Sequence, residues 1–152
     1  MPGKSKDQII TYYNNTPYQL ELMPSRIEDS GLGVFTKEFI PAGSFIGYYE
    51  GHWAHNTRKA SNYSYYINSK TMIDIDPLNK PYTCMFNDAY RTDFKNNIRS
   101  EVLLDQEIVK IIRQKNSHRY DANRAVGLYA TRNIYPGDEM YFEYGDFYWK
   151  DW

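Results

Sequence analysis

The chain has 152 residues, of which 41% are apolar, and this suits one domain with a buried core but leaves no room for a second. Its 18 basic and 19 acidic residues are scattered and give a formal net charge of −1, which argues against binding nucleic acid mainly by neutralising phosphates. The single cysteine, Cys84, excludes an internal disulfide and a zinc site made of several thiolates, so we expect no metal.

The chain also lacks the features of a membrane or secreted protein. No stretch is long and apolar enough for a spanning helix, and the polar Met1 to Asp7 do not form the basic-then-apolar start of a signal peptide. We therefore expect a soluble, intracellular protein with no membrane partner. Residues 1–8 are rich in Pro, Gly, Lys and Ser and predict a flexible N-terminus, followed by a single domain over residues 9–152.

The first half of the chain predicts short strands joined by turns. Tyr18 to Met23 alternates apolar and polar residues like a strand, and the polar, glycine-containing Ser25 to Gly33 predicts a loop. His52 to Ala60 has no clear pattern. Further along, the sequence predicts two short strands and then a turn-rich connection, at Tyr63 to Ile67, Thr71 to Ile75 and Asp76 to Pro81.

The second half contains an irregular segment, a strand and the strongest helical pattern. Cys84 to Asn97 mixes small, aromatic and charged residues without a clean period, which is typical of a functional site. Asn97 to Leu103 predicts a strand. Asp105 to Lys115 predicts a helix, because three isoleucines share one face and the segment begins with a capping aspartate. Aromatic residues make up 17% of the chain, which favours strands, so we predict a mainly β fold.

Residues 33–51 and 127–145 repeat one pattern of strand, Pro/Gly turn and strand, without a gap, at an offset of 94 positions from Gly33 to Gly127. Four positions are identical in the two repeated units, namely Gly33 and Gly127, Ile40 and Ile134, Gly43 and Gly137, and Gly51 and Gly145. The second strand of each unit ends in tyrosine, at Tyr49 and Tyr144. Packing of the two units against each other would bring two phenols to one site.

Single motifs in this chain are compatible with purely structural roles. Gly31-Leu32-Gly33 precedes a strand and lets the backbone approach a ligand closely, but it also suits a turn that needs positive φ. Asn87 fits a turn, and Tyr49 and Tyr144 fit buried strand positions. The order in which the motifs occur along the chain distinguishes a functional role from a purely structural one.

In that order, the motifs resemble the SET domain of protein lysine methyltransferases. The opening Gly31-Leu-Gly-Val-Phe35, the middle Asn87-Asp-Ala89 and the closing Glu143-Tyr-Gly145 carry the resemblance, which runs from about Pro17 to Trp152. It implies a SET-type fold of several short β-sheets, with one or two short helices and a C-terminal segment threaded in a pseudoknot-like way. The chain resembles a minimal SET domain, without the cysteine-rich zinc modules that many relatives place before and after it.

The resemblance also implies a site for S-adenosylmethionine. The positions that match its cofactor-binding motifs are Gly31, Leu32, Gly33, Asn87, Asp88 and Trp149. Asp88 stands where the family usually has histidine, and Asn96-Asn97 follows after an insertion where the family has Pro-Asn. Trp149 would cover the adenine ring, with Tyr148 and Trp152 as alternatives, unless this aromatic only seals the core.

The remaining matched positions belong to the channel for the substrate lysine. Tyr144 would be the catalytic tyrosine and Tyr49 its partner, with Phe142 setting how many methyl groups fit around the nitrogen; phenylalanine there suggests di- or trimethylation. Further wall residues would come from Tyr63, Tyr65 and Tyr66. A dry, phenol-lined channel favours the neutral amine that a direct methyl transfer requires.

We therefore expect an S-adenosylmethionine-dependent protein lysine methyltransferase that acts on histone or other basic protein tails, in the nucleus if histones are the substrate. Because no zinc modules complete the groove, we also expect a homodimer. The alternative is a catalytically inactive SET-like module that binds peptides, as the altered Asp88 position suggests. A β-domain that stacks single-stranded nucleic acid would need a basic groove that the sequence lacks.

Overall fold

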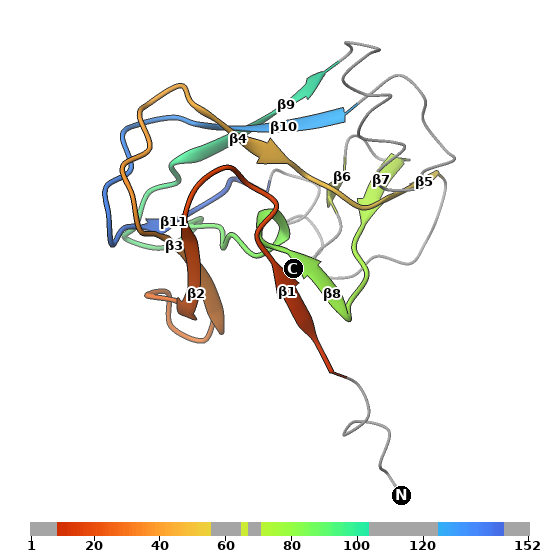
Figure 1. Ribbon diagram of the computed structural model, residues 1–152, viewed down its shortest axis with the longest axis horizontal. Helices are drawn as coiled ribbons and strands as arrows, with labels where there is room; N and C mark the ends of the chain where they lie inside the picture. The colour runs from red at the N-terminus through yellow and green to blue at the C-terminus, as the bar shows by residue number, and fades with distance from the viewer. Residues whose placement is uncertain (1–8, 56–64, 67–70, 104–124, 145–152) are drawn as a thin grey trace, which may run out of the picture.

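Short β-strands make up nearly all the regular structure in the part of the chain that the computed structural model describes, residues 9–55, 65–66, 71–103 and 125–144. Eleven strands form four small sheets there, and one short 3-10 helix, η1 (Tyr82–Cys84), lies outside the sheets (Figure 1). The predicted mainly β fold of several short sheets is confirmed. Within these residues no helix has the length and apolar character needed to cross a bilayer.

The two repeated units build two of the sheets by exchanging strands. The first unit contributes β3 (Leu32–Thr36) and β4 (Phe45–Tyr48), and the second contributes β10 (Ala125–Ala130) and β11 (Glu139–Met140). β4 pairs antiparallel with β10, and β11 pairs antiparallel with β3, so each sheet contains one strand of each unit. Isolated bridging between Ile40 and Ile134 joins the units at their centre.

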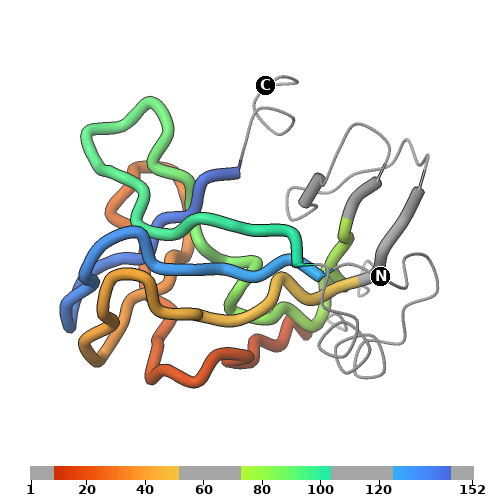
Figure 2. The backbone as a smooth tube through the Cα atoms, turned by 90° about the horizontal axis from the view of Figure 1, so that it is seen from above, coloured from red at the N-terminus to blue at the C-terminus, as the bar shows by residue number. Residues whose placement is uncertain are grey.

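One additional strand completes each of these two sheets. β2 (Leu20–Pro24) pairs with β3, and β9 (Ile98–Leu103) pairs with β10. Figure 2 shows β4, β10 and β9 running side by side across the molecule. The predicted strands at Tyr18 to Met23 and Asn97 to Leu103 are thereby confirmed.

The core lies between the sheets and repeats the pattern of the two units. Equivalent apolar positions are fully buried in both copies, namely Val34 and Leu128, Ile40 and Ile134, and Ile46 and Met140. Phe86 and Phe142 are also buried among them. Burial of this apolar surface is the main force that holds the two units together.

The other two sheets are smaller. β5 (His52–His55), β7 (Thr71–Asp74) and β6 (Tyr65–Tyr66) form one antiparallel sheet with β7 at its centre. β1 (Thr11–Tyr13) and β8 (Asn79–Pro81) form a parallel pair. The predicted strands near residues 63–67 and 71–75 correspond to β6 and β7.

One sequence prediction needs correction, and one segment that the sequence left unassigned begins with a strand. The segment from Asp76 to Pro81 is not only a turn, because its last three residues form β8; the backbone N–H of Thr11 donates to the Leu78 carbonyl, and this long-range partner has no local signature. The unpatterned segment that starts at His52 begins with β5. The predicted helix at Asp105 to Lys115 and the predicted flexible N-terminus lie outside the described residues.

The segment after β11 is inserted between two earlier parts of the chain. Tyr141 bridges in parallel with Asn87 on one side, and Phe142 bridges in parallel with Ile98 on the other. The Phe142 N–H donates to the Asn87 carbonyl at 2.9 Å, and the Ile98 N–H donates to the Tyr141 carbonyl at 3.0 Å. This is the threaded arrangement that the resemblance implies.

Candidate active site

The ends of the two repeated units meet around one buried phenylalanine, Phe142. Tyr49 follows β4 and is buried, and Tyr144 lies after β11 and is half-buried. The ring of Phe142 packs near both, with centroid distances of 6.4 Å to Tyr49 and 6.0 Å to Tyr144, and we call these three residues the aromatic row. The structure thus brings together the three residues that the sequence assigned to the lysine channel.

The segment from Phe86 to Asp88 holds Tyr144 at two points. The Tyr144 hydroxyl donates to the Phe86 carbonyl at 2.7 Å. The Tyr144 backbone N–H donates to Asp88 Oδ2 at 2.9 Å. The phenol and the main chain are therefore both tied to the middle motif, which lies 56 or more positions earlier in the chain.

The Gly31-Leu32-Gly33 motif forms the end of a tight loop and the start of β3. The loop is closed by the Ser25 N–H, which donates to the Gly31 carbonyl at 2.8 Å. Gly31 has a φ of +62°, in the left-handed region that favours glycine, so the turn requirement is met. The Asn87 side chain donates to the Leu32 carbonyl at 3.0 Å, so this amide joins the glycine motif to the middle motif.

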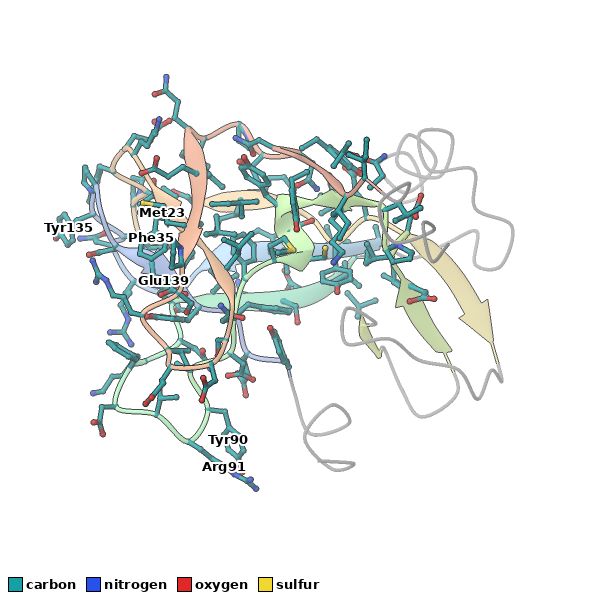
Figure 3. All side chains as sticks on the ribbon, turned by 90° about the horizontal axis from the view of Figure 1, so that it is seen from below. Met23, Phe35, Tyr90, Arg91, Tyr135 and Glu139 are labelled. Atoms are coloured by element: carbon teal, nitrogen blue, oxygen red, sulfur yellow. The ribbon has the colours of Figure 1, made fainter. Side chains whose placement is uncertain are left out.

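A buried carboxylate that the sequence analysis missed anchors the same loop. Glu139 is only 2% exposed and accepts three hydrogen bonds, from the Ser25 hydroxyl at 2.7 Å, the Arg26 N–H at 2.8 Å and the Tyr141 hydroxyl at 3.0 Å. Figure 3 shows Glu139 beside Phe35, its partner in the β11 and β3 pairing. Three donors compensate for the desolvation of this side chain.

The Glu139 carboxylate leaves no space for a side chain at Gly33. A Cβ at Gly33 would overlap Glu139 Oε2 and would lie 2.9 Å from Glu139 Cδ. A larger residue would push the carboxylate away from Ser25 and Arg26. The second glycine of the motif is therefore explained by close packing rather than by positive φ.

Two side chains have pKa values that exclude them as reactive anions near neutral pH. Burial raises the pKa of the Cys84 thiol to about 12, although nearby Lys80 acts in the opposite direction. Burial, followed by the hydrogen bond to Glu139, raises the pKa of the Tyr141 phenol. Cys84 is thus a core residue and not a nucleophile. No cluster of three or more potential metal ligands occurs among the residues that the structure describes.

The other predicted site residues are only partly described. Tyr65 and Tyr66 form β6, at one edge of the sheet, where it pairs with β7. Tyr63 and Trp149 lie outside the described residues, as do Tyr148 and Trp152. The described geometry therefore covers the glycine motif, the middle motif and the row of Tyr49, Phe142 and Tyr144.

Comparison with known proteins adds an independent view. A family model described as the SET domain matches residues 31–145. No curated protein matches the chain. Among solved structures, it is similar to KRYPTONITE in complex with mCHH DNA, an H3(1-15) peptide and SAH, with a TM-score of 0.62 and 24% identity over 85% of this chain and 24% of that one.

Two further solved structures show the same fold. KRYPTONITE in complex with mCHG DNA and SAH has a TM-score of 0.62 and 24% identity, over 86% of this chain and 24% of that one. A chain of an active polycomb repressive complex 2 in the stimulated state has a TM-score of 0.61 and 20% identity, over 85% and 15%. The present chain thus spans a quarter or less of the proteins that it resembles.

Proposed function

Because the chain belongs to the SET-domain family, we propose that it is an S-adenosylmethionine-dependent protein lysine N-methyltransferase. The observation that carries this proposal is the row of Tyr49, Phe142 and Tyr144, built from both repeated units and tied to the middle motif. Two phenols near one buried phenylalanine suit a narrow channel for an uncharged amine.

The residues beside this row fit the cofactor. At Gly31 an added Cβ would meet nothing within 4 Å, so the backbone there is open to a ligand. Asn87 holds the adjoining Leu32 carbonyl, and Asp88 follows it in the same segment. We propose that Gly31, Leu32, Gly33, Asn87, Asp88 and Trp149 hold S-adenosylmethionine, and that Asp88 does so through its backbone, because its carboxylate is bonded to Tyr90, Asn96 and Tyr144. When bound, this cofactor supplies an electrophilic methyl group on a positively charged sulfur.

The aromatic row would then prepare the lysine. A free lysine has a pKa of about 10.4, so keeping its amine neutral at pH 7 requires roughly 4 to 5 kcal/mol. Tyr49 and Phe142 are buried and would remove water from the ammonium, which lowers its pKa. Neutral phenols orient the amine by hydrogen bonding, whereas a carboxylate at the same place would keep it protonated.

The hydrogen bond of Tyr144 defines its part in this step. Its hydroxyl proton is donated to the Phe86 carbonyl, so toward a substrate amine the phenol oxygen acts as an acceptor of an N–H. This would orient the lysine nitrogen so that its lone pair faces the methyl group that a bound S-adenosylmethionine would supply, and a direct transfer of this kind needs no enzyme-bound intermediate. The chain contributes mainly position and desolvation.

We further propose that the substrate is a histone tail or another basic protein tail. One similar structure contains an H3(1-15) peptide, although the match is restricted to part of that protein. Within the described residues, β6 borders only β7, so an extended peptide can pair with the other edge of β6, which contains the proposed channel residues Tyr65 and Tyr66. If histones are the substrate, the protein acts on chromatin.

The altered position Asp88 supports one alternative, a SET-like module that binds peptides without catalysis. The two functions differ in their use of the cofactor. An active enzyme binds S-adenosylmethionine and turns it over, and an inactive module binds a tail without transfer.

The test combines a transfer assay with calorimetry. The chain is incubated with core histones and S-adenosylmethionine labelled in the methyl group, and cofactor binding is measured separately. We expect transfer by the wild type, loss of transfer in Tyr144→Phe, and normal transfer in Tyr135→Phe. Tyr135 is an exposed tyrosine at the Pro/Gly turn of the second repeated unit. Peptide binding without cofactor binding would favour the inactive module, and full activity of Tyr144→Phe would overturn the proposed mechanism.

A further inference from the structure

The side chain of Asp88 accepts a backbone hydrogen bond that a main-chain carbonyl would accept in a regular parallel ladder. The carbonyl of Asn87 accepts the Phe142 N–H, as in a parallel ladder, so the next N–H to be bonded is that of Tyr144, with the Ala89 carbonyl as its regular acceptor. The Ala89 carbonyl instead accepts from Thr92, through its N–H and its hydroxyl. The Tyr144 N–H therefore donates to Asp88 Oδ2 and not to the Ala89 carbonyl.

The other oxygen of the same carboxylate closes the loop that follows. Asp88 Oδ1 accepts from the Tyr90 N–H and from Asn96 Nδ2, both at 2.9 Å. Asn96 Oδ1 in turn accepts the Ala89 N–H at 2.8 Å. The loop from Tyr90 to Lys95 projects from the body of the molecule, with Tyr90 and Arg91 at its tip (Figure 3). One buried side chain thus joins this loop to Tyr144.

The pattern of donors makes a carboxylate the suitable group at this position. Two donors meet Oδ1 and one meets Oδ2, and only a side chain with two acceptor oxygens serves all three. A neutral imidazole, which the family usually has here, offers a single acceptor nitrogen. The aspartate that replaces the usual histidine at position 88 therefore suits the three donors that surround it in this chain.

We propose that Asp88 is a positioning residue for Tyr144, and that it sets the rate of methyl transfer rather than the affinity for the cofactor. The inference rests on the proposed function. Asp88 fixes the Tyr144 main chain, and the Phe86 carbonyl fixes its phenol, so the oxygen that orients the amine is held from both ends. Loss of the main-chain tie lets the ring shift, and a shift of about 1 Å reduces transfer by as much as a hundredfold.

Asp88→Asn tests this selectively. The amide oxygen serves the two donors on the loop side, and the NH₂ group then faces the Tyr144 N–H, which it cannot accept. Asp88→Glu keeps the negative charge but moves the oxygens by one methylene, so a purely electrostatic role would survive this change and a positioning role would not. Asp93→Asn, on the exposed part of the same loop, is the matched control.

Two measurements are made on each variant. Amide hydrogen exchange by NMR compares Tyr144 with Phe142, whose N–H is bonded to the Asn87 carbonyl and serves as an internal reference. Kinetics with core histones give kcat, and calorimetry gives the Kd for S-adenosylmethionine. We expect Asp88→Asn and Asp88→Glu to increase exchange at Tyr144 but not at Phe142, and to lower kcat about tenfold or more with Kd changed less than about twofold.

Three results would overturn the proposed role of Asp88. Unchanged exchange at Tyr144, or unchanged kcat, would overturn the proposal, and so would exchange that rises equally at Phe142, because Asp88 would then support only the fold. A wild-type chain that transfers no methyl group would overturn the proposed function together with the kinetic part of this inference. The exchange data would still decide whether Asp88 holds Tyr144.

Discussion

Ile40 and Ile134 each donate a backbone hydrogen bond to the other's carbonyl oxygen, and both N···O distances are 2.8 Å. These residues occupy the same position in the two repeated units, so the pair marks a local twofold axis. The bonds around it are also matched, since the Gly43 N–H donates to Ala130 and the Gly137 N–H donates to Thr36, again at 2.8 Å. Each unit therefore supplies the partners that the other lacks.

The two glycines of these turns are predicted to respond alike to substitution. Gly43 has a φ of +84° and Gly137 has a φ of +92°, and an added Cβ would meet nothing within 4 Å at either place. Gly43→Ala and Gly137→Ala should each lower the free energy of unfolding by about 1 to 2 kcal/mol, because of backbone strain alone. Urea unfolding checks this, with Gly47→Ala as a control that lacks positive φ. Clearly unequal losses at the two turns would contradict the symmetry.

Enlarging Gly33 is predicted to weaken cofactor binding by displacing Glu139. Gly33→Ala places a methyl group against Glu139 Oε2, and the carboxylate then loses its bonds to Ser25 and Arg26. We expect a loss of stability of about 1 to 3 kcal/mol and a weaker Kd for S-adenosylmethionine by calorimetry. Glu139→Gln should lower stability in the same direction. Normal affinity in a folded Gly33→Ala variant would show that this loop does not shape the site.

Stability is predicted to fall at alkaline pH, in part because of Cys84. The thiol has an ordinary pKa of 9.0 and a folded-state pKa of about 12, so the folded state holds its proton while the unfolded state loses it. The stabilisation is complete below pH 9 and is lost as the pH rises toward 12, with a slope of at most about 1.4 kcal/mol per pH unit.

Urea unfolding between pH 8 and 10 measures this slope. Cys84→Ala should make the decline in stability over that range shallower, whatever its effect at pH 7. Equal slopes for the two proteins would contradict the raised pKa. The raised pKa of Tyr141 acts in the same direction at higher pH, and Tyr141→Phe is the corresponding variant there.

Phe142 is predicted to set the number of methyl groups transferred. Its ring lies near both phenols and the residue is 2% exposed, so an added hydroxyl must occupy space within the aromatic row. Phe142→Tyr should shift the products from di- and trimethyl-lysine toward monomethyl-lysine, as read by mass spectrometry of the histone peptides. Tyr129→Phe, in the middle of β10, serves as the control. An unchanged product distribution would exclude Phe142 from the channel.

The repeated units and the row of aromatic residues could be predicted from the sequence because local pattern and global fold agree there. Alternating residues and Pro/Gly turns give strands of the right length, and equivalent apolar positions in both units are buried. The pairing of β1 with β8 could not be predicted in this way. It joins residues 67 or more positions apart, and one of its strands contains turn-forming residues.

The buried carboxylate of Glu139, which the sequence analysis missed, could have been found from the repeat. Glu139 occupies the position that Phe45 holds in the first unit, so a charged residue replaces an aromatic one at a strand position of the repeat. Such a replacement indicates a buried polar group with dedicated partners. The contacts of Asp88 left no comparable signal, because they depend on the turn at Ala89 and on the backbone of Tyr144, which lies 56 positions later in the chain.

The threaded segment also bears on the synthesis of the protein. The groove between Asn87 and Ile98 is made 40 or more residues before Tyr141 to Glu143, which fill it. On a growing chain, the carbonyls of Asn87 and Ile98 therefore remain without these partners, as in an open sheet edge. Such edges pair readily with other chains, so translation of this protein passes through a stage that is prone to aggregation and suited to protection by a chaperone.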